Sequence, residues 1–497
     1  MAKVSPTLKS WKRPVSIPRQ RGKPLDYYLL LLAGDVFFFL IAFILACLVR
    51  DGISRLFSGL PEFYFMQDFP PLLKRCWIFL PVFVFLAFRR AYDRRLPFWE
   101  ETREILASLF WGVVAVYALV SLKKLQPEIS RLVVGFTGVF SMFLLPFGRF
   151  YSKCFLFSFK RYSSVALIFG AGRTGRCLAQ ALHQEKYLGY RVVGFLDDNP
   201  SLYGRIFEGL KVYGPIRQVG KFVRLMNVEA IFIAGTSFSP KRLAEIYALS
   251  QRLVREIYVV PEFYGLGILN AELSCLFSRQ LFVLRIRNNL ILPLNRFFKR
   301  VFDLVLIMLS LPVILPFMGI IALLIKIDSP GPVFFRHKRL GENGRPFYIF
   351  KFRTMHPEAE RLLTDYLCHD PRAAYEWFVY RKLRPDPRVT RIGKFLRKFS
   401  LDELPQIFNV LKGEMSLIGP RPITEEECRL YYGNRASFYF SVKPGLTGLW
   451  QVSGRNLLSF EERVRLDVWY VLNWSLWLDL VILVRTVGTV ISQRGSF

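Results

Sequence analysis

Long apolar runs separated by short polar connections fill the first 150 residues of the chain. They extend over Tyr27–Leu48, about Leu72–Phe88, Ile105–Leu122 and Leu132–Phe147. Each run approaches the roughly 20 residues that cross a bilayer as a helix, so we predict a four-helix transmembrane bundle over residues 25–150. The second run is the weakest, because Lys74 and Arg75 lie near its start. Asp35 lies inside the first run, and we expect it to face the bundle interior because an unpaired charge in lipid is costly.

Positive charge marks the cytoplasmic side of this bundle. Residues 1–24 are rich in Lys and Arg, and no clear cleavage site follows the first apolar run, which predicts a basic cytoplasmic tail instead of a signal peptide. The second connection carries the largest group of loop arginines, Arg89, Arg90, Arg94, Arg95 and Arg103. Because positive loops stay inside the cell, both ends of the bundle should lie in the cytoplasm.

Residues 160–290 change to short apolar strands that alternate with helices. Strands are predicted at Val165–Phe169, Arg191–Leu196, Ala230–Ala234 and Glu256–Val260, with a helix at Arg173–His183 after the first. This order predicts a doubly wound, Rossmann-like α/β domain on the cytoplasmic side.

A glycine-rich turn joins the first strand of this domain to its helix. Its sequence, GAGRTG from Gly170 through Gly172 to Gly175, fits a dinucleotide fingerprint, and Asp197 ends the next strand. These four residues are candidates for binding a nucleotide, because the turn lets backbone N–H groups approach a phosphate. The same turn also occurs in domains that bind no dinucleotide, so a structural role stays open. No Tyr-x-x-x-Lys pair occurs in the domain, which argues against sugar dehydratase or epimerase chemistry.

A fifth apolar run, Leu304–Ile325, is also long enough to cross a membrane. Lys and Arg lie at both of its ends, so the loop asymmetry that orients a span is missing. Ser310, Pro312 and Pro316 interrupt its middle, and each proline removes a backbone hydrogen bond. A helix bent there can dip into the membrane and return to the same face, with Ser310 satisfying a freed carbonyl. We therefore predict a re-entrant membrane helix over about residues 301–327.

Composition and charge narrow the function further. The chain has 497 residues, enough for three domains, and combines 52% hydrophobic residues with a formal net charge of +31. Such a charge suits nucleic acid, an anionic membrane surface or phosphorylated substrates. The basic residues flank apolar runs and no nucleic-acid-binding motif occurs, so we expect no nucleic acid partner. Seven scattered cysteines without a CxxC pair indicate a reducing compartment and argue against zinc.

Two adjacent carboxylates, Asp402 and Glu403, follow a strongly basic stretch that includes Arg397. Nearby cations favour ionised carboxylates and can grip a phosphorylated substrate, as a carboxylate nucleophile attacking phosphorus requires. Taken alone, the motif fits a structural alternative better. Ser400 and Glu403 have the spacing of a capping box ahead of an apolar helix.

Four further motifs surround this pair in sequence order. They are KFRTM at Lys351–Met355, NVLKGEMS at Asn409–Ser416, GPRP at Gly419–Pro422 and TGLWQVSGR at Thr447–Arg455. With them, residues 295–497 resemble the monotopic phosphoglycosyl transferases, bacterial enzymes that move hexose 1-phosphate from a nucleotide diphosphate sugar to undecaprenyl phosphate. The organisation is that of the large members, which add an N-terminal membrane bundle and a middle nucleotide-fold domain. The family's re-entrant helix has adjacent Ser and Pro, whereas here Leu311 separates Ser310 from Pro312.

The resemblance implies a mixed α/β catalytic domain and a two-step, Mg²⁺-dependent reaction that releases UMP. Asp402 would be the nucleophile that forms an aspartyl phosphosugar, and Glu403 would help hold Mg²⁺. Candidates for binding the substrate are Lys351, Arg353, Arg397, Arg421, Gln451 and Arg455. The reaction would start O-antigen, capsule or exopolysaccharide synthesis on the cytoplasmic face of the bacterial inner membrane.

The sequence leaves several alternatives open. Galactose or glucose is the expected hexose of the UDP-sugar, but no motif reads the sugar hydroxyls, so an N-acetylated or deoxy sugar is a rival. A rival from another class is a membrane-anchored nucleotide-binding regulator with an inactive transferase domain. The run Trp469–Val490 predicts an interfacial helix, with an ordinary buried helix as its alternative. A homodimer is compatible with the sequence, which does not identify the glycan pathway.

Overall fold

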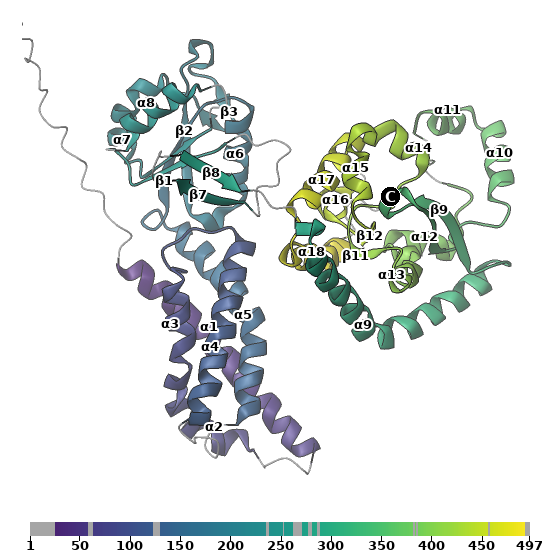
Figure 1. Cartoon of the computed structure of the whole chain (residues 1–497), viewed down its shortest axis with the longest axis horizontal. Helices are drawn as coiled ribbons and strands as arrows, with labels where there is room; N and C mark the ends of the chain where they lie inside the picture. Colours follow the sequence, from purple (N-terminus) through teal and green to yellow (C-terminus); the bar gives the residue numbers. More distant parts are fainter. Residues whose placement is uncertain are drawn as a thin grey trace, which may run out of the picture. The chain divides into compact units, whose positions relative to one another are not determined.

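The structure is a computed structural model of the whole chain (Figure 1). It describes residues 25–57, 63–122, 130–234, 238–251, 253–261, 271–276, 281–285, 289–380, 383, 386–455 and 458–492. The predicted basic tail, residues 1–24, lies outside the described residues. The chain divides into two compact units, Met1–Glu262 and Phe263–Phe497.

The N-terminal unit begins with the predicted apolar helices. Helices α1 (Leu25–Leu56), α4 (Phe98–Leu122) and α5 (Arg131–Ser158) are each long and apolar enough to cross a membrane. The second predicted span differs from the expectation, since it starts earlier and is broken. Helix α2 (Phe65–Lys74) meets the segment Cys76–Phe88, which consists of η1 (Cys76–Phe79) and α3 (Leu80–Phe88), at 62°.

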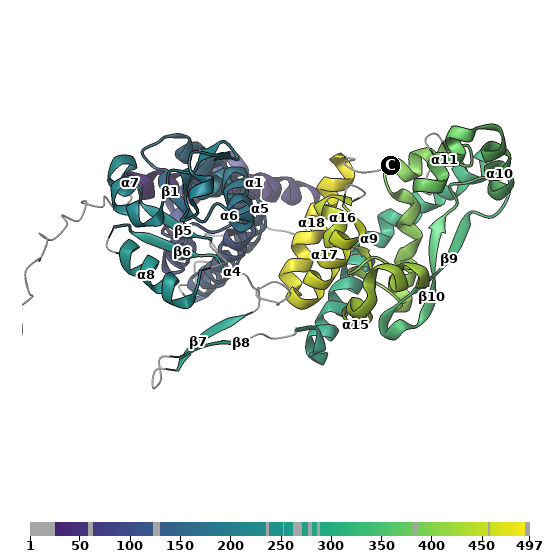
Figure 2. The same ribbon diagram turned by 90° about the horizontal axis from the view of Figure 1, so that it is seen from above.

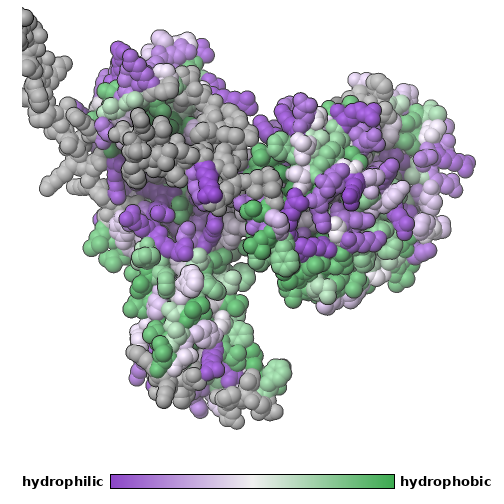
Figure 3. Space-filling view, viewed as in Figure 1, coloured by the Kyte–Doolittle hydropathy of each residue, from purple (hydrophilic) through white to green (hydrophobic). Residues whose placement is uncertain are grey.

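Aromatic and aliphatic side chains fill the bundle interior and also cover its exterior. Phe39, Phe43 and Val82 are almost fully buried between the helices. Phe110 and Phe143 point outward and are more than half exposed, so the lower part of this unit is largely green in Figure 3. Apolar side chains on both the inside and the outside are typical of a bundle whose solvent is lipid.

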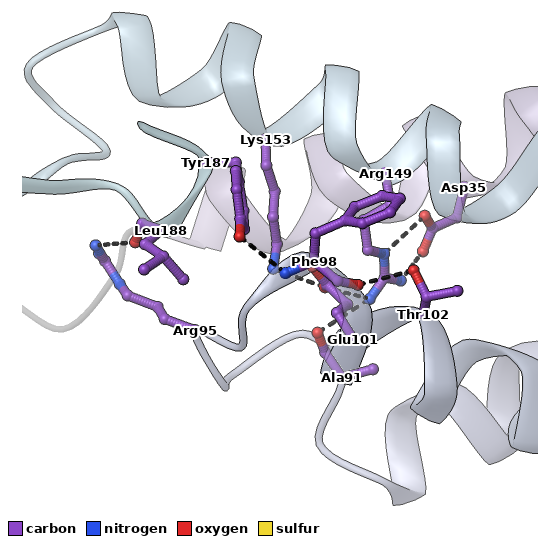
Figure 4. Close-up of polar contacts among 10 residues, drawn as sticks. All are labelled: Asp35, Ala91, Arg95, Phe98, Glu101, Thr102, Arg149, Lys153, Tyr187 and Leu188. Atoms are coloured by element: carbon purple, nitrogen blue, oxygen red, sulfur yellow. Dashed lines mark hydrogen bonds and ion pairs between the residues drawn. The ribbon is translucent and has the colours of Figure 1, made fainter. Parts of the chain in front are cut away.

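Four buried charges form a network inside the bundle (Figure 4). The Arg149 guanidinium donates to both carboxylate oxygens of Asp35 and to the carbonyl of Ala91. Lys153 Nζ lies 2.6 Å from Glu101 Oε1, and Arg149 Nη1 lies 3.5 Å from the same oxygen. All four charged side chains are at most 7% exposed. The prediction that Asp35 faces the bundle interior is therefore confirmed, and the network carries no net charge when all four groups are ionised.

A parallel α/β domain follows within the same unit. Its sheet has the order β2-β1-β5-β6, formed by β1 (Ser164–Phe169), β2 (Tyr190–Leu196), β5 (Ala230–Ile233) and β6 (Glu256–Val259). Helix α6 (Arg173–Gln184) packs on one side of β1, and α7 (Val219–Met226) and α8 (Pro240–Ser250) pack on the other. The strands and the first helix agree with the sequence prediction.

Polar contacts of Arg95 and Phe98 join the bundle to this domain. Arg95, in the connection between α3 and α4, donates to the Leu188 carbonyl at 3.0 Å and to Ser164 Oγ at 2.7 Å. The backbone N–H of Phe98 donates to the Tyr187 hydroxyl at 2.9 Å (Figure 4). Arg95, one of the loop arginines from which the orientation of the bundle is predicted, thus also connects the α/β domain to the bundle.

The C-terminal unit is built on a long bent helix, α9 (Pro293–Asp328), which descends and rises again in Figure 1. Pro312 and Pro316 lie inside it, and Ser310 Oγ donates to the Ile307 carbonyl at 2.9 Å. One side of the helix buries Ile307, Met318, Ile321 and Ile325, and the other exposes Leu309, Val313, Leu323 and Ile327. The predicted bend is present, while the return of both arms to one membrane face stays a prediction.

Short elements pack on the buried side of α9. Figure 2 shows β9 (Phe334–Leu340) and β10 (Pro346–Phe352) as a long antiparallel ribbon. The remaining elements relevant to the site are α10 (Ala359–His369), α11 (Pro371–Tyr380), α12 (Arg391–Lys398), η7 (Leu401–Gln406), α13 (Ile407–Lys412), β11 (Ser416–Ile418), α14 (Glu425–Glu427), η8 (Cys428–Tyr432), β12 (Gly445–Thr447) and α16 (Leu449–Ser453). Two hairpins, β3 (Ile206–Phe207) with β4 (Leu210–Lys211) and β7 (Glu272–Leu276) with β8 (Leu281–Arg285), complete the strands.

The C-terminal run forms two helices where the sequence predicted one. Helix α17 (Phe460–Asn473) ends before Trp474, and α18 (Leu476–Ser492) begins two residues later. Asp479 of α18 is fully buried, where it accepts hydrogen bonds from Tyr470, Trp474 and Lys299. One face of α18 is therefore packed in the protein, and its exposed Val487 and Ile491 leave the predicted interfacial role untested.

Candidate active site

A strained turn sets the direction of the two central carboxylates. Thr390 Oγ1 accepts the backbone N–H of Gly393 at 2.9 Å and so caps α12. At the other end of α12, Ser400 has a left-handed backbone (φ +56°) that redirects the chain into η7. Its side chain makes no capping hydrogen bond, so the capping-box alternative for Ser400 and Glu403 is wrong. The carboxylates are left available for other contacts.

Lys351 of β10 lies between these carboxylates and the rest of the site. Its Nζ is 2.6 Å from Glu403 Oε1 and 3.7 Å from Asp402 Oδ2. This contact depends on the tertiary fold, because β10 packs directly against η7 although 50 residues of chain separate Lys351 from Leu401. β10 thus places the Lys351 ammonium group beside Asp402 and Glu403, which are adjacent in the sequence.

The surroundings shift the pKa values of Asp402 and Glu403 in opposite directions. Burial, and then the Glu403 charge, raise the pKa of Asp402, although Lys351 and Arg397 oppose this. Burial alone would also raise the pKa of Glu403, but Lys351 and Arg421 outweigh it and lower that pKa. The expectation that cations favour ionisation is thus met for Glu403, whereas the pKa of Asp402 lies above its ordinary value. Adjacent acids with separated pKa values are typical of sites in which two carboxylates have different roles.

A narrow pocket opens beside Glu403. Its lining residues are Arg339, Ile349, Lys351, Glu403, Gln406, Arg421, Pro422, Leu446 and Gln451. Four predicted site residues, Lys351, Glu403, Arg421 and Gln451, therefore meet at one place. Three of the lining side chains are cationic and one is anionic, which suits a phosphorylated ligand.

The other predicted substrate-binding residues lie in different positions. Arg397 is close enough to Asp402 to stabilise its charge, and its Nε donates to Thr354 Oγ1 at 3.0 Å. Arg455 has a left-handed backbone (φ +50°) and lies within electrostatic reach of Glu403. Arg353 is buried, and its guanidinium donates to Ser329 and to the Pro330 carbonyl just after α9. These contacts indicate a structural role for Arg353.

Around the predicted Arg421, several residues behind the pocket were missed by the sequence analysis. Arg421 and Arg463 both lie over the Trp450 ring, with Cζ at 5.3 and 4.8 Å from its centre. Near them, the Tyr432 hydroxyl donates to Asp467 Oδ2 at 2.7 Å, and burial raises the pKa of Asp467 to about 7. These residues come from α16, α17 and η8, so only the tertiary fold could reveal the cluster.

One of the two carboxylates, Glu403, is also the candidate metal ligand. The described residues contain no group of three or more His, Cys, Asp or Glu side chains that could hold a metal ion. Glu403 nevertheless fits Mg²⁺, which typically uses one or two carboxylates together with substrate phosphates. The predicted role of Glu403 as a Mg²⁺ ligand is compatible with this arrangement.

The glycine-rich turn of the middle domain is packed tightly. A Cβ on Gly175 would lie 1.9 Å from the Gly170 carbonyl oxygen, so close helix–strand packing alone requires this glycine. Asp197 accepts the backbone N–H of Ala171 at 2.7 Å and that of Asn199 at 2.8 Å. The Asp197 carboxylate therefore already accepts the Ala171 N–H, a turn donor that would otherwise be available to a bound phosphate. Nucleotide binding at Gly170, Gly172, Gly175 and Asp197 stays a prediction.

Comparisons with known proteins agree with both halves of this architecture. Residues 294–493 match the family described as "Bacterial sugar transferase", and residues 91–261 match the family described as "CoA-binding domain". The chain is 36% identical over 481 residues to "UDP-galactose-lipid carrier transferase" of Erwinia amylovora, spanning 96% of this chain and 98% of the relative. It is also 36% identical to "Undecaprenyl-phosphate galactose phosphotransferase" of Salmonella typhimurium, over 82% of this chain and 84% of the relative. A third relative, "UDP-glucose:undecaprenyl-phosphate glucose-1-phosphate transferase" of Escherichia coli, is 31% identical over 66% of this chain and 67% of its own.

Proposed function

Since the chain belongs to the bacterial sugar transferases, which act as phosphoglycosyl transferases, we propose that its reaction proceeds through a covalent intermediate on Asp402. The donor is a UDP-sugar, the acceptor is undecaprenyl phosphate, and the first product is UMP. The relatives named above support galactose or glucose as the hexose. The observation that carries the mechanism is the position of Asp402 beside Glu403, Lys351 and a cation-lined pocket.

In the first step, an oxygen of the Asp402 carboxylate attacks the β-phosphorus of the UDP-sugar. The bond from this phosphorus to the oxygen bridging the two phosphates breaks, and its electron pair leaves with UMP. Lys351 and Arg397 neutralise charge on the side of Asp402. Arg421, together with Lys351, neutralises charge on the side of Glu403. Positioning and charge neutralisation of this kind account for most catalysis of phosphoryl transfer.

In the second step, a phosphate oxygen of undecaprenyl phosphate attacks the phosphorus of the aspartyl phosphosugar. The bond to Asp402 breaks, which restores the free carboxylate and gives a lipid-linked diphosphate sugar. Glu403 would hold Mg²⁺, which supplies additional neutralisation of the phosphate oxygens when bound. Because the carboxylate must be ionised to attack, Lys351 and Arg397 assist by opposing the burial and the Glu403 charge that raise the pKa of Asp402.

The apolar helices support a position in the bacterial inner membrane. UDP-sugars are soluble cytoplasmic donors, so we place the catalytic unit on the cytoplasmic face. The arginines of the second connection support this orientation of the bundle. Both α9 arms returning to that face would keep the pocket near the lipid acceptor.

The test is the first half-reaction without acceptor. Wild-type protein mixed with UDP-galactose or UDP-glucose and Mg²⁺ should gain the mass of one phosphohexose, on the peptide that contains Asp402. Asp402→Asn should fold normally, bind the donor and gain no mass, because an amide is a far poorer nucleophile than a carboxylate. Asp365→Asn, which changes an exposed acid of α10, is the matched control and should be labelled like the wild type.

Three results would change the proposal. A label on Glu403 would exchange the roles of the two acids. A fully active Asp402→Asn would reject covalent catalysis. Failure of the wild type to release UMP from any UDP-sugar, including N-acetylated and deoxy donors, would favour an inactive transferase domain with a regulatory role.

A further inference from the structure

Arg339 is a pocket residue that neither the motifs nor the named relatives assign. It lies on β9 opposite Phe347 of β10, and its side chain is 11% exposed. Its Nη1 is 3.0 Å from Glu427 Oε2, and its Nη2 is 3.3 Å from His337 Nδ1. The buried Nε has no hydrogen-bond partner among the described residues. A buried guanidinium with an unsatisfied donor beside a cation-lined pocket is suited to bind an anionic ligand, since an unmet buried donor is costly.

The cations of the site divide between the two carboxylates. Arg397 acts on Asp402, whereas Arg421 and Arg339 act on Glu403, and Lys351 reaches both. Arg339 and Arg421 line the same pocket, so they can contact one ligand. Burial lowers the pKa of Arg339, and repulsion by Arg421 adds to this, despite the pair that Arg339 forms with Glu427. An anion between the two guanidiniums would relieve that repulsion.

The chemistry requires anion sites on both sides of the reacting phosphorus. In an in-line displacement the nucleophile and the leaving group lie on opposite sides of the phosphorus. With Asp402 as nucleophile, the transferred phosphoryl group lies beside Asp402 and Arg397. The leaving phosphate then lies away from Asp402, where Glu403, Arg339 and Arg421 form the pocket. Guanidinium groups suit this position because they bind phosphate oxygens in a bidentate manner.

We propose that Arg339, together with Arg421, binds the phosphate of the leaving UMP, and that Glu427 holds Arg339 in place for it. This inference rests on the proposed function and adds a product site to it. Glu427 is itself fixed, because it forms a capping box with Thr424 at the start of α14. The alternative is a purely structural pair that ties β9 to α14.

Inhibition by UMP separates these possibilities. The leaving phosphate of the first step and the attacking phosphate of the second step both lie opposite Asp402, so a phosphate site at Arg339 matters in both half-reactions. Arg339→Gln should therefore slow adduct formation from UDP-sugar and raise the inhibition constant of UMP by about 10- to 100-fold, as expected for loss of a charged hydrogen bond. Arg339→Lys keeps the positive charge but loses the planar guanidinium. Its rate of adduct formation and its inhibition constant for UMP should therefore lie between those of the wild type and Arg339→Gln. Inhibition by uridine, which lacks the phosphate, should change less than 3-fold.

The second half-reaction tests the same site with the acceptor phosphate. Protein labelled to completion, freed of nucleotide and mixed with undecaprenyl phosphate should transfer its sugar more slowly in Arg339→Gln than in the wild type. Lys338→Gln, which removes the neighbouring exposed cation on the same strand, should match the wild type in every assay. Glu427→Gln should weaken UMP binding less than Arg339→Gln does.

Each remaining outcome decides against the inference. Inhibition by uridine that weakens as much as inhibition by UMP would show that Arg339 has a structural role. An unchanged inhibition constant for UMP would place the leaving phosphate elsewhere. Both results require a wild-type protein that forms the adduct. A wild-type protein that forms no adduct would reject the proposed function itself, and with it the assignment of Arg339 to the UMP phosphate.

Discussion

Replacing Asp467 by Asn should change the pH dependence of stability in a predictable direction. Burial raises the pKa of this carboxyl from 3.8 to about 7, while the Tyr432 hydrogen bond, Arg421 and Arg463 only partly oppose it. In the unfolded chain the group returns to its ordinary pKa near 3.9. An acid with a raised folded pKa favours the folded state while it is protonated. Its contribution is therefore complete below about pH 4, declines as the pH rises to about 7, and stays constant above that.

The magnitude follows from the size of the pKa shift. Roughly three pH units correspond to about 4 kcal/mol, of which about 3 kcal/mol is lost between pH 5 and pH 8. Asn has no charge to lose and can still accept the Tyr432 hydroxyl. The free energy of unfolding of Asp467→Asn, relative to wild type, should therefore rise by about 3 kcal/mol from pH 5 to pH 8. For a unit of this size, that corresponds to roughly 6–12 °C in Tm.

The assay is thermal unfolding of both proteins in the same detergent, followed by tryptophan fluorescence at several pH values. The difference between the two Tm values cancels the titration of all other groups. Tyr432→Phe is the control, because loss of the hydroxyl removes a hydrogen bond that lowers the Asp467 pKa and should extend the loss of stability to higher pH. A Tm difference that does not change between pH 5 and pH 8 would show that Asp467 ionises normally and would refute the argument.

Three further predictions concern the membrane elements and the division of the chain. Replacing Pro312 and Pro316 together by Leu should straighten α9 and lower activity at least about 10-fold with little loss of folding. UMP release and tags at both helix ends would measure this. Unchanged activity would contradict a functional bend. A fragment of residues 289–497 keeps the Asn289 contact to Trp474 and should form the adduct at a rate within about 10-fold of the whole chain. A folded fragment that binds the donor without turnover would contradict the prediction that the C-terminal unit is sufficient for the chemistry. Glu101→Gln should cost about 3–5 kcal/mol, because it leaves Lys153 buried without its carboxylate, whereas the exposed Glu100→Gln should leave Tm nearly unchanged.

Periodic and local features of this protein could be predicted from the sequence. Apolar runs identify α1, α4, α5 and α9, and the alternation of short strands identifies the sheet. Pro312 and Pro316 predict a bend within α9 because a proline acts on its own helix. The grouping of Lys351, Glu403 and Arg421 was also accessible, since each lies in a motif that the family resemblance covers.

Features that depend on side-chain direction or distant pairing could not be predicted. Arg339 appeared only as a basic residue after α9, because nothing local shows that β9 turns this position toward the pocket. Arg353 shares a motif with Lys351, yet the chain directs it to the end of α9. The Ser400 and Glu403 spacing suggested a cap, but the left-handed backbone at Ser400 breaks that geometry. Alternation along the hairpin from Arg339 to Lys351 was the one signal that could have linked the two cations.

The balanced charges of the bundle have an evolutionary consequence. Asp35, Glu101, Arg149 and Lys153 neutralise one another entirely within the N-terminal unit. Because the ionic network requires no partner from the catalytic residues, recombination could join this bundle to another catalytic module without compensating substitutions there. Within the bundle the opposite holds, since losing any one charge would strand another in a nonpolar interior. These four positions should therefore be inherited as a set, while the modules on either side of residue 262 remain free to diverge at different rates.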